Sequence, residues 1–195
     1  EQPPGVFPSP ASLSRYASRT IAYPPPNREP DRYAETLLRI VTEREIRVLI
    51  PVHDFELIPV LQRRREFDQR TIVPFPDYET FLLTWDKVRT LDVASSAGIP
   101  IPRTWRLDGD PDALADRLPY PVVLKTRSQT WIDHGRGRSA YVTGMNYVRS
   151  RDEFRRRCEE IRGAAPEFIV QEYVHGYAAG VAALFNRGEP RATFA

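Results

Sequence analysis

One lysine stands at the end of an apolar segment, where a fixed positive charge could meet a ligand. The segment covers residues 118–125 and reads LPYPVVLK. Pro119 and Pro121 disfavour a helix, and the apolar run beside them is typical of a strand covered on both faces. Lys125 ends this run and precedes a polar, glycine-bearing stretch at residues 126–137. Such a lysine can bind a phosphate, although a solvated lysine at a strand end is the alternative interpretation.

Other reactive residue types give no comparable signal. His53, His134 and His175 lack the mutual spacing of metal ligands, so we interpret them as structural or surface residues and predict no metal site. No serine or cysteine nucleophile motif is visible. Cys158 is the only cysteine, which excludes an internal disulfide and fits a reducing compartment, so we expect a cytoplasmic protein.

Length and charge restrict the classes of function. The 195 residues include 41% hydrophobic residues, enough for one large or two small cores, and we expect two compact units. The 28 basic and 26 acidic residues nearly balance, which does not indicate nucleic-acid binding. Two arginine clusters, at 63–65 and 155–157, fall in helical patterns that also carry acids, and we interpret them as solvated faces. No run approaches the roughly 20 apolar residues of a membrane helix, and no leader opens the chain.

The first part of the chain alternates helical and strand-like patterns. Residues 31–41 and 54–65 have helical periodicity, whereas residues 46–51 and 71–73 are short apolar runs typical of strands. This alternation predicts a small parallel sheet with helices packed on it.

The second part has a different composition. A helical pattern at residues 77–97, broken near Trp85, leads into a proline-rich stretch, so we place a boundary between Phe81 and Pro102. A long basic loop at 126–138 between two strands suggests a flap. The predicted elements that follow the boundary are strands at 103–107, 122–125, 139–143 and 168–174, helices at 111–118 and after Ser150, and a hairpin of 180–185 with 191–194.

An ordered series of short motifs resembles the ATP-grasp superfamily, in particular its carbamoyl-phosphate-synthase-like and carboxylate–amine ligase members. Each motif alone is weak, but the series covers about residues 86–195 in the order and spacing of that superfamily. The motifs are DK at 86–87, GIPIP at 98–102, PVVLK at 121–125, GRG at 135–137 and VQEYV at 170–174.

The resemblance implies a fold class and a division of the chain. The expected class is α/β, with a small parallel-sheet pre-ATP-grasp domain followed by an α+β ATP-grasp subdomain. The expected divisions are residues 1–85 for the first domain, 86–102 for a linking helix and proline-rich lead, and 103–195 for the nucleotide-binding region. The missing initial methionine and an apparent strand running to the last residue suggest a fragment truncated at both ends.

The resemblance also implies roles for individual residues. The ATP phosphates would be bound by Lys87, Lys125 and the loop containing Gly135, Arg136 and Gly137. The adenine would be held by Gln171, Glu172, Tyr173 and Val174, with backbone groups of Glu172 and Val174 pairing its edge. Magnesium ligands would lie beyond Ala195, so Mg²⁺ is expected only in the full-length protein.

The implied function is the ATP-binding portion of an ATP-dependent carboxylate–amine ligase that acts through an acyl phosphate. Its partners would be ATP, a carboxylate and an amine; this part alone is expected to be inactive, and it could associate through an unpaired sheet edge. One departure leaves an alternative open. Where similar enzymes carry a glutamate suited to the ribose hydroxyls, this chain reads Tyr177-Ala178-Ala179, which slightly favours a non-catalytic nucleotide-binding module or partner subunit.

Overall fold

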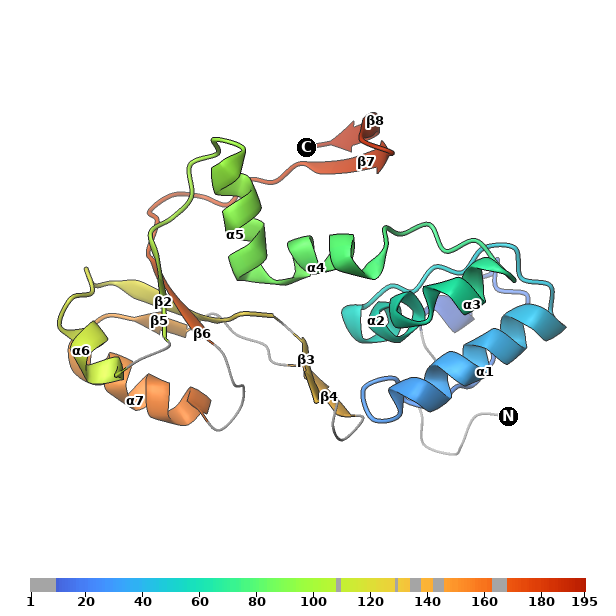
Figure 1. The fold of residues 1–195 in the computed structure, drawn as a ribbon, viewed down its shortest axis with the longest axis horizontal. Helices are drawn as coiled ribbons and strands as arrows, with labels where there is room; N and C mark the ends of the chain where they lie inside the picture. Colours follow the sequence, from blue (N-terminus) through green and yellow to red (C-terminus); the bar gives the residue numbers. More distant parts are fainter. Residues whose placement is uncertain (1–9, 108–109, 129, 134–137, 142–145, 163–167) are drawn as a thin grey trace.

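The computed structural model shows two lobes joined by a pair of helices (Figure 1). It describes residues 10–107, 110–128, 130–133, 138–141, 146–162 and 168–195. The joining helices are α4 (Tyr78–Trp85) and α5 (Lys87–Ser96), so the predicted break near Trp85 is confirmed. Each lobe has its own cluster of buried apolar side chains. The exact domain limits proposed from the sequence remain a prediction.

Helix packing builds the core of the first lobe. Helix α1 buries Tyr33, Leu37 and Val41, which recur at intervals of four residues and therefore line one face. That face contacts a second apolar group that includes Val60 and the fully buried Phe67. The helix predicted at 54–65 is divided in two at Arg63. The helices of this lobe are η1 (Pro10–Leu13), α1 (Pro30–Glu43), α2 (Asp54–Gln62) and α3 (Arg64–Asp68).

The prediction of a parallel sheet in this lobe is wrong. Its two strand-like segments meet in a single parallel bridge, Val48 with Ile72, and the sheets of the described residues are antiparallel. Each segment runs into a proline, Pro51 or Pro74, which has no N–H group to extend the pairing. Val48 and Ile72 are also 46% and 63% exposed, so the burial that favours a parallel sheet is missing here.

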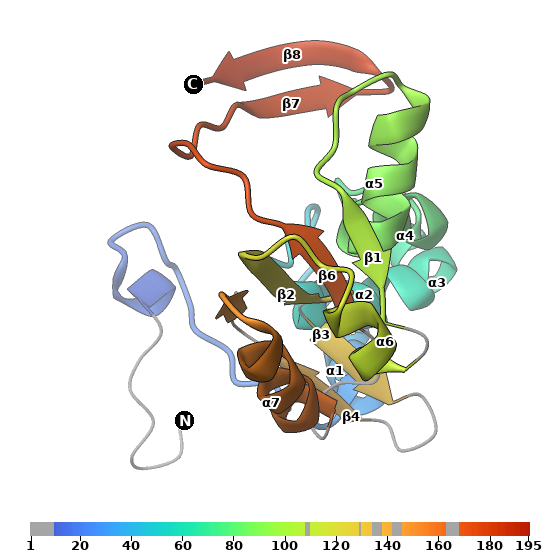
Figure 2. The ribbon, with the colours of Figure 1, turned by 90° about the vertical axis from the view of Figure 1, so that its left-hand side faces the viewer.

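The second lobe is built on a four-stranded antiparallel sheet in the order β1-β6-β2-β5. Helices α6 and α7 lie on one side of this sheet and α5 lies on the other (Figures 1 and 2). The elements are β1 (Thr104–Arg106), α6 (Pro111–Ala115), β2 (Val122–Thr126), β5 (Asn146–Val148), α7 (Arg151–Arg162) and β6 (Phe168–Glu172).

The core of this lobe follows from alternation along the strands. Val122, Leu124 and Val170 project to the face that α6 and α7 cover, and each is at most 1% exposed. Phe154 and Cys158 of α7 complete this core. The opposite face of the same strands is available to carry other chemistry.

Two hairpins accompany the sheet. Strand β3 (Thr130–Asp133) lies within the segment 126–138 that was predicted as a loop and flap, and it pairs with β4 (Arg138–Tyr141), which overlaps the strand predicted at 139–143. Residues 134–137 between them, which include Gly135 and Gly137, lie outside the described residues. Strands β7 (Ala182–Asn186) and β8 (Glu189–Phe194) form the predicted C-terminal hairpin.

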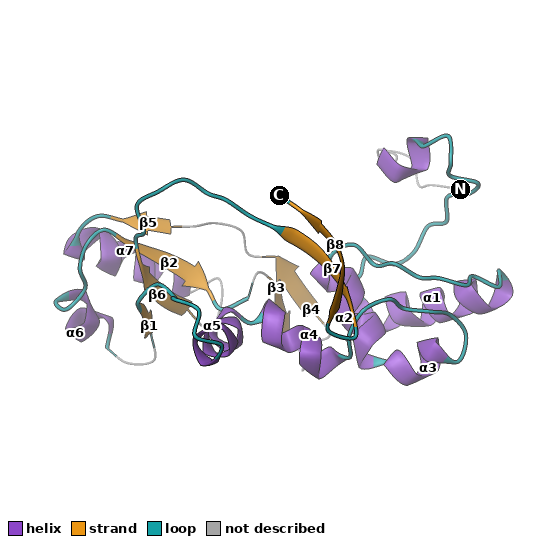
Figure 3. Cartoon of the chain, turned by 90° about the horizontal axis from the view of Figure 1, so that it is seen from above, coloured by secondary structure: helices purple, strands orange, loops and turns teal. Residues whose placement is uncertain are grey.

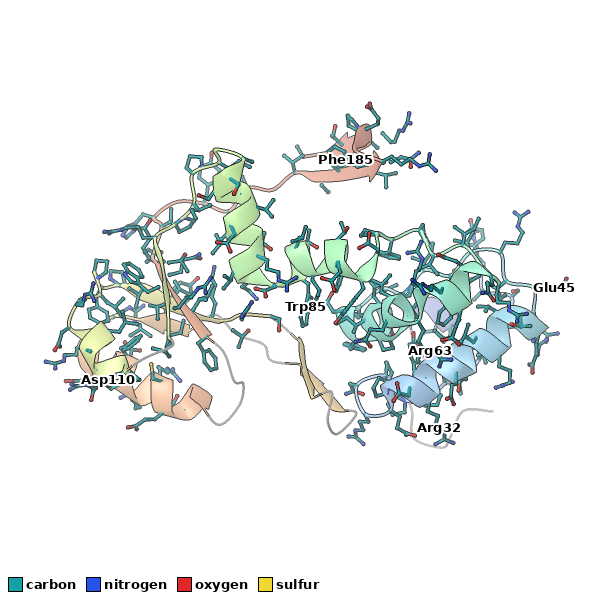
Figure 4. All side chains as sticks on the ribbon, viewed as in Figure 1. Arg32, Glu45, Arg63, Trp85, Asp110 and Phe185 are labelled. Atoms are coloured by element: carbon teal, nitrogen blue, oxygen red, sulfur yellow. The ribbon has the colours of Figure 1, made fainter. Side chains whose placement is uncertain are left out.

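The β7–β8 hairpin packs little against either lobe. Figures 2 and 3 show it separate from the four-stranded sheet, and Figure 4 shows Phe185 on it, remote from both cores. Phe185 and Phe194 are 58% and 68% exposed. Association through the edge of this hairpin remains a prediction. Among the described residues, no helix is both long and apolar enough to cross a bilayer.

Candidate functional site

The ammonium group of Lys125 is held by a relay of side chains across three strands. Lys125 Nζ on β2 donates to Gln171 Oε1 on β6 over 2.7 Å. Gln171 Nε2 in turn donates to Thr104 Oγ1 on β1 over 3.1 Å. Gln171 is 7% exposed, and its amide uses both of its ends in this relay. The relay therefore fixes the position of the lysine at the end of the sheet.

Strand register explains why these residues meet. Val123 of β2 lies opposite Gln171 of β6. On the other edge of β6, Gln171 lies opposite Thr104 of β1. Lys125 is two residues beyond Val123 and so projects to the same face, diagonal to Gln171. The relay thus lies on the face of the sheet that α6 and α7 leave uncovered, where Val123 and Ile169 are buried as well.

Lys87, the first residue of α5, lies beside the end of β2 that carries Lys125. Its backbone N–H donates to the carbonyl of Arg127, two residues beyond Lys125, over 2.9 Å. Partial burial lowers the pKa of the Lys87 amine, and the charge of Lys125 lowers it further, while Asp54 and Asp86 oppose that shift. Burial also lowers the pKa of Lys125. Two half-buried cations therefore share one region, an arrangement suited to an anion with several charges.

A composition signal that the sequence reasoning missed points to the same pair. The chain contains 28 basic residues, and only Lys87 and Lys125 are lysines; all the others are arginines. The fold places these two, 38 positions apart in the printed sequence, within electrostatic reach of each other. Lysine is a compact, strongly hydrated charge, whereas arginine is a planar donor. The two lysines are thus distinguished from the arginines both by residue type and by their nearness to each other.

Asp86 and Arg127 join the two elements that carry the lysines. Asp86 Oδ1 caps α5 by accepting from the N–H groups of Val88 and Arg89 over 2.9 and 3.3 Å. Its Oδ2 accepts from Arg127 Nε over 2.7 Å. Asp86 is 7% exposed, which is rare for a carboxylate and requires such partners. The sequence places Asp86 in the DK motif at 86–87 but gives no indication that Arg127 is its partner.

The residues of the segment predicted to bind adenine make different kinds of contact. The Gln171 side chain faces Lys125 rather than solvent. Glu172 accepts from the backbone N–H and from Nε of Arg103 over 3.0 and 2.8 Å, and this arginine holds the pKa of the carboxyl below its ordinary value. Tyr173 lies edge-on to Tyr147 and His175, with ring centroids 5.8 and 4.7 Å apart. An aromatic group therefore flanks the end of β6.

The remaining site predictions concern Val174 and the glycine loop. Val174 is 62% exposed beyond the end of β6. Gly135, Arg136 and Gly137 lie outside the described residues, and only the strands on either side of them are placed. Their predicted contact with phosphates therefore stays a prediction.

The described residues offer no ready metal centre. Within the described ranges, no group of three or more His, Cys, Asp and Glu side chains could hold a metal ion. The residues present here therefore do not provide the carboxylate set that Mg²⁺ prefers. Two open hollows, of about 440 and 490 Å³, lie beside α1 and α3 and beside β1 and α6. Neither is lined by Lys87 or Lys125, so we do not connect them with phosphate binding.

Comparisons with known proteins give one relative by sequence. No known family model matches the chain. The vancomycin/teicoplanin A-type resistance protein VanA of Enterococcus faecium is 29% identical over 116 residues, which are 58% of this chain and 31% of VanA. The chain therefore spans about a third of the length of this relative.

Solved structures of two enzymes share the fold of a large part of this chain. The D-alanine–D-alanine ligase of Bacillus anthracis, solved with ATP, matches 73% of this chain and 45% of its own, with a TM-score of 0.55 and 18% identity. The biotin carboxylase domain of the Hydrogenobacter thermophilus 2-oxoglutarate carboxylase, solved with MgADP, matches 79% of this chain and 34% of its own, with a TM-score of 0.50 and 19% identity. The resemblance to the ATP-grasp superfamily that the motifs indicate is therefore confirmed over the part of the chain that these proteins match.

Proposed function

We propose that the chain is the ATP-binding portion of an ATP-dependent carboxylate–amine ligase. The observation that carries this proposal is the meeting of its only two lysines, Lys87 and Lys125, at one end of the sheet. Paired cations on fixed elements suit a polyphosphate because they supply charge without reorganisation. One of the similar structures is named as a ligase of two amino acids and contains ATP, which supports the same reading.

The reaction follows from what a ligase of this kind must do. A carboxylate oxygen of one substrate attacks the γ-phosphorus of ATP, the bond to the β–γ bridging oxygen breaks, and ADP leaves. The amine of the second substrate then attacks the acyl carbon and phosphate leaves, which forms the C–N bond. Lys87 and Lys125 would hold the phosphates in line, because positioning and charge are the main contributions of protein to phosphoryl transfer.

The far end of the nucleotide would lie along β6. Backbone groups of Glu172 and Val174 would pair the adenine edge, and the ring of Tyr173 would contribute apolar surface nearby. The Arg103–Glu172 ion pair occupies the Glu172 side chain, and the Glu172 N–H donates to the Arg103 carbonyl over 2.9 Å, so Glu172 would serve the base through its own carbonyl.

The proposal is tested by titrating the 195-residue chain with ATP and ADP in a calorimeter, with circular dichroism as the check of folding. We expect weak binding of both nucleotides. A folded chain that gives no heat at millimolar nucleotide would contradict the proposal. Parallel assays of ADP release should show no turnover by this chain, while the whole protein should release ADP only when both a carboxylate and an amine are present.

A second candidate is a non-catalytic nucleotide-binding module or partner subunit. Tyr177, which is 92% exposed, stands where similar enzymes carry a ribose-binding glutamate, and this departure favours the second candidate. A whole protein that binds ATP but releases no ADP with any acid and amine tested would support it.

A further inference from the structure

We propose that the Asp86–Arg127 ion pair is a positioning device that holds Lys87 and Lys125 at the separation a polyphosphate requires. This inference rests on the proposed nucleotide-binding function. It assigns a role to two residues that make no proposed contact with the nucleotide themselves.

The two lysines need such a device because they repel each other. Both amines are half-buried, and each carries a positive charge that disfavours the other. They also belong to separate elements, since Lys87 is the first residue of α5 and Lys125 lies near the end of β2. Without a connection, the free protein would lower its energy by letting the amines move apart, and a nucleotide would then have to bring them together again.

The connection consists of three contacts at one corner. Arg127 Nε donates to Asp86 Oδ2 over 2.7 Å, and the Lys87 N–H donates to the Arg127 carbonyl over 2.9 Å. Asp86 Oδ1 holds the first turn of α5 by accepting from Val88 N–H over 2.9 Å. The start of α5 and the end of β2 are thereby tied within one residue of Lys87 and two residues of Lys125.

The two carboxylate oxygens of Asp86 make different interactions, so a substitution can remove one interaction and keep the other. Oδ1 serves the helix cap, and Oδ2 faces Arg127. Asparagine is as good an N-cap as aspartate, so Asp86→Asn should keep the cap while it removes the negative charge that pairs with Arg127 at 2.7 Å and, more weakly, with Arg89 at 3.9 Å. Arg127→Met should remove the same ion pair from the other side while it keeps the backbone carbonyl that Lys87 uses.

The competing explanation is that Arg127 itself contacts the phosphates. Its side chain is 36% exposed, against 10% for that of Asp86. The two explanations differ for Asp86→Asn. Loss of a negative charge beside the site would leave binding equal or stronger if Arg127 were a direct ligand, whereas it would weaken binding if the ion pair positions the lysines.

The experiment is a double-mutant cycle on the 195-residue chain, with ADP and adenosine as probes. We expect Asp86→Asn and Arg127→Met each to weaken ADP binding about tenfold, equal to one charge-assisted hydrogen bond, and the double variant to lose no more than either single variant. Binding of adenosine, followed by saturation-transfer NMR, should not change, because it has no phosphate for the lysines to hold.

Matched controls come from an ion pair of the same type elsewhere in the second lobe. Arg151 Nε lies 2.6 Å from Asp116 Oδ1, between α7 and α6. Asp116→Asn and Arg151→Met should leave ADP binding within about twofold of the parent, as for surface ion pairs of small energy.

A direct readout of geometry is available because the chain has only two lysines. Reductive methylation with ¹³C-formaldehyde should give two lysine NMR signals, and both should shift in Asp86→Asn and Arg127→Met but not in the controls.

Each result decides between the explanations. Additive losses in the double variant, or ADP binding unchanged in Asp86→Asn, would overturn the positioning role and leave the proposed function standing. Equal losses for ADP and adenosine would also overturn it, since they would indicate general unfolding. If the parent chain binds no ADP while it is folded, the proposed function fails and this inference fails with it.

Discussion

The two faces of the four-stranded sheet are made from the same strands but have different purposes. On one face, Val122, Leu124 and Val170 pack against α6 and α7 and are almost fully buried. On the other, Lys125 and Gln171 form a polar relay beside the start of α5. Because strand side chains alternate, stability and ligand chemistry are separated by a single residue step. Substitutions on one face should therefore change one property and leave the other nearly intact.

The largest effect should come from the buried face. Phe154 on α7 is fully buried in this core, and Phe154→Ala should lower the free energy of unfolding by about 3–5 kcal/mol. Urea denaturation followed by circular dichroism measures this loss.

Tyr147 on β5 provides the comparison on the other face. It lies opposite Val123, the direct neighbour of the relay, and is 47% exposed. Tyr147→Ala should cost about 1 kcal/mol or less, since little of its surface is removed from water. If Tyr147→Ala were as destabilising as Phe154→Ala, the division of roles between the faces would be wrong.

The next largest effect concerns binding alone. Lys125→Met should weaken ATP binding by about 1.5–3 kcal/mol, because it removes one charge-assisted contact with a phosphate. The free energy of unfolding should change little, because removal of a half-buried charge offsets the cost of leaving the buried Gln171 Oε1 without its donor. Calorimetry with ATP and urea denaturation test the two parts. A variant that binds ATP as well as the parent would show that Lys125 is a surface lysine without a role in binding.

A smaller effect is expected from pH. Burial lowers the pKa values of Lys87 and Lys125 below their ordinary value of 10.5, so both amines lose their protons at a lower pH than free lysine does. ATP binding should therefore weaken as the pH rises through these lowered values, still below 10.5. The stability of the free protein should change in the opposite direction, because in this range the unfolded chain binds more protons than the folded one.

Titration of the two methylated lysine signals, with and without ATP, measures this effect. Bound phosphate favours the charged amines and should move both pKa values upward. Signals that titrate identically in the presence and absence of ATP would show that the lysines do not meet the phosphates.

The smallest expected effect is on backbone protection. The segment 126–138, with its strand β3 outside the four-stranded sheet, should exchange its amide hydrogens more slowly once ATP is bound. The strands β2 and β6 within the sheet should show little change. Equal protection of segment 126–138 with and without ATP, measured by mass spectrometry, would contradict its predicted role as a flap.

Local signals in the sequence predicted individual elements better than their partners. The apolar run before Lys125 predicted β2, and the C-terminal turn signal predicted the β7–β8 hairpin, because both depend on neighbouring residues. The parallel pairing of the first lobe was wrong, since the pattern indicates a strand but not what lies beside it. The bond between Arg127 and Asp86 joins positions 41 residues apart, and no local pattern encodes such a pair. The two lysines of the candidate site could therefore be named from the sequence, whereas the contacts that fix them could not.

The scarcity of lysine gives this protein an unusual response to chemical labelling. Amine-reactive dyes, acylating agents and cross-linkers normally modify many exposed lysines, but here Lys87 and Lys125 are the only side-chain targets. Both are half-buried with lowered pKa values, so they should react mainly as neutral amines. A label attached in this way would sit at the junction of α5 and β2. Attachment of the protein to a sensor surface through amines would consequently block the region where nucleotide is proposed to bind, whereas attachment through the arginine-rich faces or a terminus would leave it open.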